Sequence, residues 1–361
     1  MDVSRNSEKA VLVLEDGTWY EGYHVGARED AFGELVFNTS VVGYQQLLTD
    51  PANENNILVH TFPMLGNYGV VEDEDDVSGA HAQAVVMRDW CNTPSNYRST
   101  GRFDEWLERK GITGIYGVDT RALTRKLRDH GTMKALVTLR EVNDSNKAQF
   151  AEEIKAHANV TPSWKNASQV VTAGNGKTKL TVVDFGARRD IIDALVSRDC
   201  TVTVVPASST KEQILATAPD GIIVSGGWVD FADAEQEKKI VEELTHTGIP
   251  MMGIGDGHLL MGLCAGGKIT KMSVGHRGAN CPVTELKTER TFITTQNHGS
   301  FIENIDSTKA EITHVNTNDK TCVGLHYLEF PGVSVQFLPE WEIGQKNFDG
   351  VYEGFLGMLK K

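Results

Sequence analysis

The sequence predicts an α/β protein with two domains. One is a mixed, strand-rich α/β domain at the N-terminus. The other is a C-terminal domain whose central, mostly parallel sheet is flanked by helices. The length of 361 residues is enough for two hydrophobic cores. The first part of the chain contains many short apolar runs bounded by turn residues, a pattern that predicts strands. Later, apolar runs of about 5–6 residues alternate with helical patterns of about 10, which is typical of βαβ units.

The N-terminal domain, predicted to cover 1–160, begins with a hairpin whose strands 11–14 and 19–25 flank an Asp16-Gly17 turn. Two helices are predicted next, one at 103–110 stopped by Gly111 and one at 120–130 stopped by Gly131. The remaining expected elements are strands at 34–37, 57–61, 84–87 and 131–138, and a polar helix at 145–160.

We expect a linker at 161–179, because residues 171–178 have the polar, glycine-containing composition of one. The C-terminal domain then covers 180–361. Its expected strands are 180–185, 201–206, 221–226 and 250–254, and its expected helices are 188–198, 209–217, 232–247 and 257–265. An antiparallel portion, around 292–295 and the pair 322–328 and 332–337, is followed by a final helix at 348–359.

Composition excludes several classes of protein. The formal net charge of −14 argues against a nucleic-acid or anionic-membrane surface, because either would repel the chain. No run approaches the roughly 18 apolar residues that span a bilayer, and the first residues lack the apolar stretch of a signal peptide. The five cysteines are scattered and never spaced as C-x-x-C, so we expect reduced thiols in a cytoplasmic protein and no metal site. No Walker-type loop occurs, and no cofactor is expected.

The most informative segment is Pro250–Leu260, in which a short apolar strand, a glycine-dense bend and a helical pattern follow one another. This is the layout of a nucleophile elbow, which carries a Ser or Cys at its apex. The apex position here is Gly255, so covalent attack from this turn is not expected. The apex, the Gly226-Gly227 loop and segment 336–340 each follow a predicted strand. In a parallel sheet the carboxyl ends of the strands form the reactive edge.

Several motifs, taken in order, resemble those of the small subunit of carbamoyl phosphate synthetase. The similarity runs from about Val11 to Leu359. The motifs are Phe37–Ser40, Gly66–Gly69, Tyr116–Arg121, Thr181–Arg189, Pro219–Gly227, Thr294–Gly299 and Val335–Glu340. The resemblance implies an N-terminal small-subunit domain and a C-terminal domain of the class I glutamine amidotransferase type. It also implies a large, ATP-using partner subunit, and it leaves open a higher oligomer and the pathway served, arginine or pyrimidine biosynthesis.

In that family the elbow Cys attacks the glutamine amide, a His activates the Cys, and a Glu orients the His. The matching positions here are Gly255, Leu338 and Glu340, so no catalytic set is intact. Loss of the nucleophile or the base of such a triad costs roughly 10⁴–10⁶ in rate. Neighbouring positions also depart from the family pattern, as expected for a natural pseudo-glutaminase rather than a single engineered change. These positions are Gly227-Trp228-Val229, Asp256, Leu259, Ser300 and Phe337.

The remaining polar positions have two interpretations each. Ser40, Gly227, Asp256, His258, Asn297, His298 and Gly299 are the candidate ligand contacts. His258 is either inherited structure or an acid–base group. His298 and Glu340 either hold a ligand or form hydrogen bonds with backbone groups of the loops. Ser40 either contacts a ligand, as the family's Ser does, or stabilises the domain interface. Cys264 has the apolar spacing of a core residue, and Trp228 and Phe337 are hypothesised to fill the substrate space.

Three functions follow from these interpretations. The first is a non-catalytic subunit that supports or regulates an ammonia-using large subunit. The second is a stand-alone small-molecule sensor built on the altered cleft. The third is a hydrolase with a replaced nucleophile.

Overall fold

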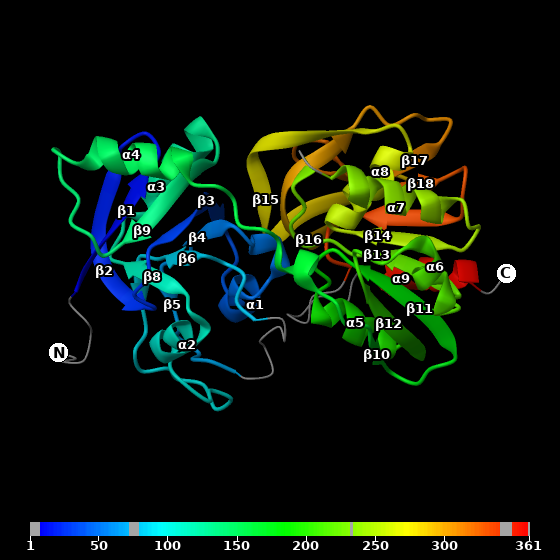
Figure 1. Cartoon of the computed structure of the whole chain (residues 1–361), viewed down its shortest axis with the longest axis horizontal. Helices are drawn as coiled ribbons and strands as arrows, with labels where there is room; N and C mark the ends of the chain where they lie inside the picture. The colour runs from blue at the N-terminus through cyan, green and yellow to red at the C-terminus, as the bar shows by residue number, and fades with distance from the viewer. Residues whose placement is uncertain (1–7, 72–78, 232–233, 340–348, 360–361) are drawn as a thin grey trace. The chain divides into compact units, whose positions relative to one another are not determined.

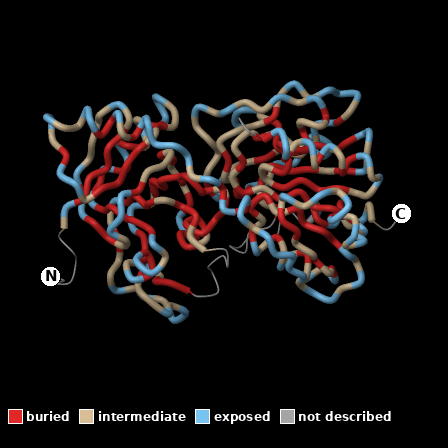
Figure 2. Tube along the Cα trace, in the orientation of Figure 1, coloured by how far each residue is buried: buried red, intermediate tan, exposed pale blue. Residues whose placement is uncertain are grey.

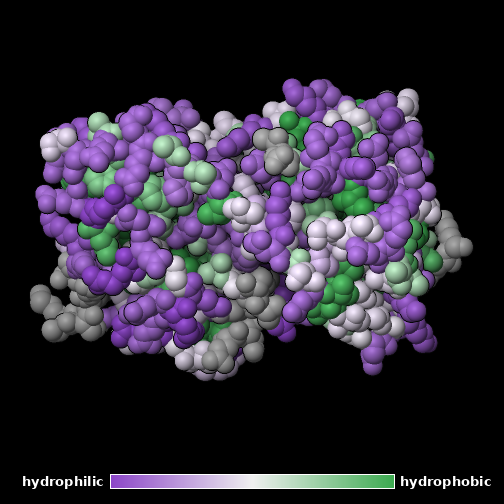
Figure 3. Space-filling view, viewed as in Figure 1, coloured by the Kyte–Doolittle hydropathy of each residue, from purple (hydrophilic) through white to green (hydrophobic). Residues whose placement is uncertain are grey.

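The computed structural model describes residues 8–71, 79–231, 234–339 and 349–359. The chain divides into two compact units, Met1–Val160 and Thr161–Lys361, and each is described by itself (Figure 1). Strands in both units run through the buried interior, and exposed segments lie mainly in loops and on helices (Figure 2). The face in Figure 3 is largely hydrophilic, with hydrophobic residues in small separate groups. Among the described residues, no helix has both the length and the apolar character needed to cross a membrane.

A closed barrel forms the centre of the first unit, with the strand order β1-β2-β8-β6-β4-β3-β9. Its interior is filled by alternate side chains of these strands, among them Leu12, Leu35, Ile57 and Val59. The predicted hairpin is confirmed, since β1 and β2 pair antiparallel. The barrel strands are β1 (Lys9–Leu14), β2 (Trp19–Gly26), β3 (Ala31–Asn38), β4 (Asn56–His60), β6 (Ala84–Val86), β8 (Thr113–Tyr116) and β9 (Met133–Thr138).

The predicted helices of this unit are confirmed. Both α2 and α3 end at a glycine with positive φ, Gly111 (71°) and Gly131 (86°), a conformation that glycine adopts without steric cost. The Asp119 side chain accepts from the Ala122 N–H and so caps the start of α3. The remaining elements are α1 (Tyr44–Leu48), η1 (Pro51–Asn53), β5 (Met64–Leu65), β7 (Asp89–Trp90), α2 (Phe103–Lys110), α3 (Thr120–His130) and α4 (Lys147–Ala156).

A ten-stranded sheet forms the second unit, in the order β10-β12-β11-β13-β14-β19-β18-β16-β15-β17. Strands β12, β11, β13, β14 and β19 pair in parallel, which confirms the predicted parallel sheet. The strands are β10 (Val171–Ala173), β11 (Thr178–Asp184), β12 (Cys200–Pro206), β13 (Gly221–Val224), β14 (Met251–Ile254), β15 (Lys268–Glu285), β16 (Arg290–Glu303), β17 (Ala310–Asn316), β18 (Cys322–Tyr327) and β19 (Gly332–Val335).

Helices cover both faces of this sheet, as predicted. One hydrophobic cluster joins α6, α7 and α8 to one face through residues such as Ile214, Val241 and Leu260. A second cluster joins α5 and α9 to the other face through Leu195 and Phe355. These elements are η3 (Ser163–Asn166), α5 (Arg189–Val196), α6 (Lys211–Ala216), α7 (Glu235–Thr245), α8 (Asp256–Cys264) and α9 (Asp349–Leu359).

Some local predictions were wrong. Residues 171–173, expected in the linker, form the edge strand β10, which pairs antiparallel with β12. Strands β5, β7, β8, β15 and β17 were not predicted. The long strand β15 has two register irregularities, Lys271/His276 and Gly278/Cys281, which interrupt the alternation that identifies a strand in sequence.

Candidate active site

The structure brings the three suspected segments together at one edge of the sheet. Strands β13, β14 and β19 are parallel neighbours, with Ile222 opposite Met251 and Ile254 opposite Val335. The Gly226-Gly227 loop, the Gly255 apex and Gln336 therefore follow the carboxyl ends of adjacent strands. The Gly255 N–H donates to the Val335 carbonyl at 3.0 Å, which ties the apex to β19.

Gly255 has the backbone geometry of an elbow apex, with φ 61° and ψ −126°. These angles mirror those of the first central residue of a type II turn, and glycine is favoured in this region. A Cβ added at this position would lie 3.0 Å from the Gly226 oxygen, a tight contact but not an overlap. The backbone turn that presents the nucleophile in such an elbow is therefore preserved, but this chain has no side chain at the apex.

Two further glycines allow α8 to begin directly against β13. A Cβ on Gly257 would lie 1.9 Å from the Val224 oxygen, and one on Gly226 would lie 2.5 Å from the Asp256 nitrogen. Since no side chain fits at either point, the start of α8 and the loop after β13 are in direct backbone contact. The position of the elbow is thereby fixed.

The segment after β13, Gly226–Val229, is called the glycine loop here. The Gly227 N–H donates to the Phe185 carbonyl at 2.8 Å. The Trp228 carbonyl accepts from the Trp164 indole N–H at 2.9 Å, and the Val229 N–H donates to the Asp256 carboxylate at 3.0 Å. Three consecutive residues of this loop are thus held by hydrogen bonds to other parts of the unit. No sequence pattern indicated the Phe185 and Trp164 contacts, because both come from distant segments.

His258 is fully buried on α8, and its Nδ1 lies 2.8 Å from the Ser334 hydroxyl. The same hydroxyl lies 2.9 Å from that of Tyr327. Burial, helped by His314, lowers the pKa of His258 to about 3, although the Ser334 contact acts in the opposite direction. The imidazole is therefore neutral at ordinary pH and part of the core, which favours the structural interpretation.

His298 is also buried, on β16. Its Nδ1 lies 2.8 Å from the Ser300 carbonyl and its Nε2 lies 3.0 Å from the Gln296 side-chain oxygen. Burial is the main cause that lowers the pKa of His298 to about 3, with His276 contributing. Both ring nitrogens are used within the strand itself. The candidates Asn297 and Gly299 flank this residue, and a Cβ on Gly299 would contact the Arg277 guanidinium at 3.1 Å.

The described cysteines of this region offer no activated thiol. Cys264 donates to the Leu260 carbonyl and Cys281 to the Gly278 carbonyl, both at 3.6 Å. Burial raises the pKa of Cys264 to about 12 and that of Cys281 to about 11. Cys322 likewise has a pKa raised to about 11 by burial. A thiol is nucleophilic as the thiolate, so these groups are inert at neutral pH.

The segment after β19 places Phe337 in the core. Its ring is completely buried in the cluster that contains Tyr352 and Phe355, and it meets His314 edge-on with ring centroids 5.6 Å apart. Leu338, at the position of the family's His, is half-buried and donates its N–H to the Thr295 carbonyl. Trp228 is half-buried. Glu340 lies outside the described residues.

Ser40 belongs to the first unit, on the turn that follows β3. It is buried, and its N–H donates to the Asn38 side-chain oxygen at 2.8 Å. Within the described ranges, no three His, Cys, Asp or Glu side chains are grouped so that they could hold a metal ion.

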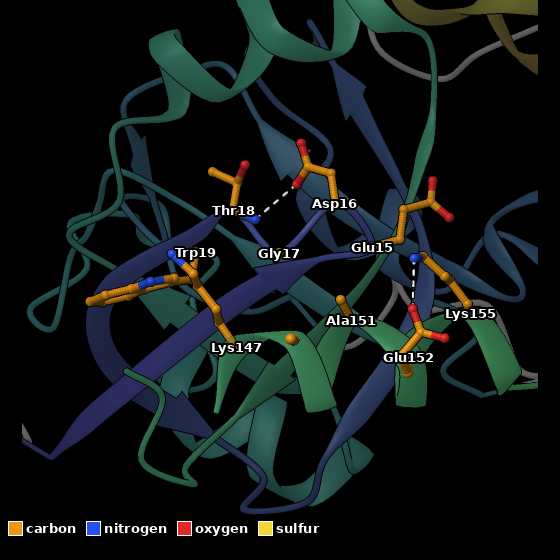
Figure 4. A pocket seen from close by; sticks show the side chains of 10 residues that line it. Glu15, Asp16, Gly17, Thr18, Trp19, Lys147, Ala151, Glu152 and Lys155 are labelled. Atoms are coloured by element: carbon orange, nitrogen blue, oxygen red, sulfur yellow. Dashed lines mark hydrogen bonds and ion pairs between the residues drawn. The ribbon is translucent and has the colours of Figure 1, made fainter. Parts of the chain in front are cut away.

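A groove of about 600 Å³ lies on the first unit between the β1–β2 turn and α4 (Figure 4). The Lys155 ammonium pairs with Glu152 at 2.9 Å, and Lys147 pairs with Asp144 at 2.7 Å. Asp16 accepts from the Thr18 N–H and pairs with Lys126. These side chains neutralise one another locally, so the groove has no convergent set of groups that indicates a ligand.

Comparisons with known proteins agree with this arrangement. The family described as carbamoyl-phosphate synthase small chain, CPSase domain, matches residues 12–137, and glutamine amidotransferase class-I matches residues 181–357. The small chain of carbamoyl phosphate synthase from Listeria monocytogenes is 36% identical over 97% of this chain and 97% of its own length. The small chain from Fusobacterium nucleatum is 38% identical over 96% of each chain. The small chain from Lactococcus lactis is 39% identical over 97% of this chain and 98% of its own. Two domain matches and full-length relatives above 30% identity lead to one conclusion: the chain belongs to the carbamoyl phosphate synthase small chain family.

Proposed function

We propose that this chain is a carbamoyl phosphate synthetase small subunit without glutaminase activity, and that it supports or regulates a large subunit that uses free ammonia. Membership of the small chain family implies a large-subunit partner. What separates this chain from a working glutaminase is the chemistry at the elbow.

The observation that carries the proposal is the apex itself. Gly255 keeps the elbow backbone, with φ 61° and ψ −126°, but has no atom that could attack an amide carbon. The position of the family's base is Leu338, a hydrocarbon side chain that can neither accept nor donate a proton. The thiols of Cys264 and Cys281 have raised pKa values, so neither supplies a substitute nucleophile.

The polar residues near the elbow also support the non-catalytic role. Asp256 binds the Val229 N–H, His258 binds Ser334, and His298 binds Ser300 and Gln296. Each therefore has a partner within its own unit. No specific contact in the described residues favours the sensor or the altered hydrolase over the subunit role.

The test is the synthesis of carbamoyl phosphate by the chain assembled with the large subunit encoded beside it or recovered with it. We expect activity with ammonium and ATP, no activity above background with glutamine, and a change in the ammonium-dependent rate when this chain is omitted. A family small chain with an intact Cys, His and Glu serves as the positive control for glutamine. Equal rates with glutamine and ammonium would overturn the proposal, and so would failure to bind any large subunit.

A further inference from the structure

We propose that Asp256 locks the glycine loop in an orientation that cannot hold an oxyanion. The elbow then carries a second block, separate from the missing thiol and imidazole. This inference rests on the proposed function and deepens it, because it adds to the missing nucleophile and base a named contact that opposes catalysis.

The Gly226–Gly227 peptide has a defined orientation relative to the apex. The described peptide bonds are trans, and in a trans peptide the C=O and N–H point in opposite directions. The Gly227 N–H donates to the Phe185 carbonyl at 2.8 Å, and the Gly226 oxygen lies 3.0 Å from the position of a Cβ on Gly255. The loop therefore turns a carbonyl oxygen toward the apex and its N–H away from it.

This orientation is the reverse of what acyl transfer requires. Attack on an amide places negative charge on the substrate oxygen beside the nucleophile, and N–H donors must point at that oxygen to stabilise it. A carbonyl oxygen carries partial negative charge and repels the developing oxyanion. With this peptide orientation, the oxyanion formed by even a restored nucleophile would lie near a carbonyl oxygen instead of an N–H donor.

Asp256 fastens the loop to the elbow. Its carboxylate accepts from the Val229 N–H, 27 residues earlier in the chain, at 3.0 Å. An acid in the first turn of a helix is favoured by the helix dipole, which explains why an Asp is tolerated there. The helix dipole does not explain the bond to Val229, which joins the first residue of α8 to the end of the glycine loop.

The carboxylate has a second effect, through its charge. It belongs to the residue that follows the apex, so a thiolate formed at position 255 would meet a like charge nearby. Like charges disfavour ionisation and raise the pKa of a thiol. Asp256 thus opposes both the ionised nucleophile and the oxyanion, in addition to holding the loop.

The test uses the full chain with Gly255→Cys, whose introduced thiol reports on the apex. We would measure the pH dependence of iodoacetamide alkylation at this introduced thiol by peptide mass spectrometry, alone and combined with Asp256→Asn or Asp256→Ala. Asn removes the charge but keeps an acceptor oxygen, and Ala removes both. The matched control is Asp193→Asn, which makes the same charge change at an exposed acid of α5 whose side chain is 60% exposed.

We expect both Asp256 substitutions to speed alkylation at pH 7 by about tenfold, since one pKa unit changes the thiolate fraction by that factor, and Asp193→Asn to leave it unchanged. Hydrogen exchange at the Val229 amide should be faster by at least tenfold in Asp256→Ala and retain protection in Asp256→Asn. Equal alkylation rates with and without Asp256 would refute the claim that its charge disfavours a thiolate at position 255. An unchanged Val229 exchange rate in Asp256→Ala would overturn the lock.

A functional arm completes the test. In the double variant Gly255→Cys with Leu338→His, acid-quenched samples with glutamine should contain no γ-glutamyl thioester, and adding Asp256→Ala should allow it to accumulate. Thioester formation at the same rate with Asp256 present would refute the second block. The proposed function is tested separately, on the unsubstituted chain. Glutamine use by that chain would refute the proposed function. The alkylation and exchange results would still show whether Asp256 holds the glycine loop.

Discussion

The elbow backbone predicts a specific cost for adding one methyl group at the apex. Gly255→Ala places a Cβ on a residue with φ 61° and ψ −126°, a region that costs an L-residue roughly 1–3 kcal/mol. The new Cβ would also lie 3.0 Å from the Gly226 oxygen, so the glycine loop must shift by a few tenths of an ångström. Loss of glycine freedom in the unfolded chain offsets about 0.4–1 kcal/mol. We therefore expect a net destabilisation of about 1–2 kcal/mol.

Two other glycines of the same unit provide matched comparisons. Gly248 has φ +73° but nothing within 4 Å of an added Cβ, so Gly248→Ala has strain alone, with a net cost of about 0.5 kcal/mol. Gly257→Ala would place its Cβ 1.9 Å from the Val224 oxygen and must cost more than either. The expected order of destabilisation is Gly248, then Gly255, then Gly257.

The assay is hydrogen exchange of the intact chain, read on peptides that cover β14 and α8, combined with urea unfolding at neutral pH. Peptide-level exchange assigns the change to the second unit. If Gly255→Ala were as stable as the parent chain, or cost less than Gly248→Ala, the apex would not have the strained geometry on which this reasoning depends.

Three further predictions concern the same region. His258 and His298 have folded pKa values of about 3 against 6.5 in the unfolded chain, so the unfolded chain binds more protons between those values and stability falls as the pH falls. From pH 7 to pH 5 each costs about 2 kcal/mol of stability. His298→Gln should remove about half of their combined loss, whereas substitution of the exposed His130 should not. A free energy of unfolding equal at pH 7 and pH 5 would contradict this. Iodoacetamide should modify Cys264 in the native chain at least tenfold more slowly than in urea, because burial raises its thiol pKa; equal rates would refute the buried assignment. Gly255→Cys alone should release no ammonia from glutamine, because Leu338 supplies no base. A coupled ammonia assay measures this release. Turnover by the single variant would show that another group activates the thiol.

Much of the fold follows from local pattern. The βαβ alternation after residue 179 identified the parallel sheet and its helices, since strand and helix periods differ and glycines mark their ends. Helices α2 and α3 were predictable because Gly111 and Gly131 stop them at positive φ. Strand β15 was not, because its register irregularities destroy the alternation. The edge strand β10 was missed for another reason: Val170 and Val171 are both exposed, and the residues that follow have the polar, glycine-containing composition of a loop.

Part of the site could likewise be predicted from the sequence, and part could not. The absence of a side chain at Gly255 and the hydrocarbon at Leu338 are properties of the sequence, and the motif order located them. The burial of His258 against Ser334 is not visible in sequence, since it depends on packing between α8 and β19. The Asp256–Val229 bond and the orientation of the Gly226 carbonyl depend on backbone angles in a loop. Residue identity alone does not determine those angles.

The most direct measurement follows the nitrogen atom. The assembled synthetase would be supplied with glutamine labelled with ¹⁵N in its side-chain amide, together with unlabelled ammonium and ATP, and the carbamoyl phosphate analysed by mass spectrometry. A product carrying only ¹⁴N is the predicted result. Product enriched in ¹⁵N beyond the spontaneous breakdown of glutamine would mean that the chain hydrolyses glutamine, which would contradict the proposed absence of glutaminase activity.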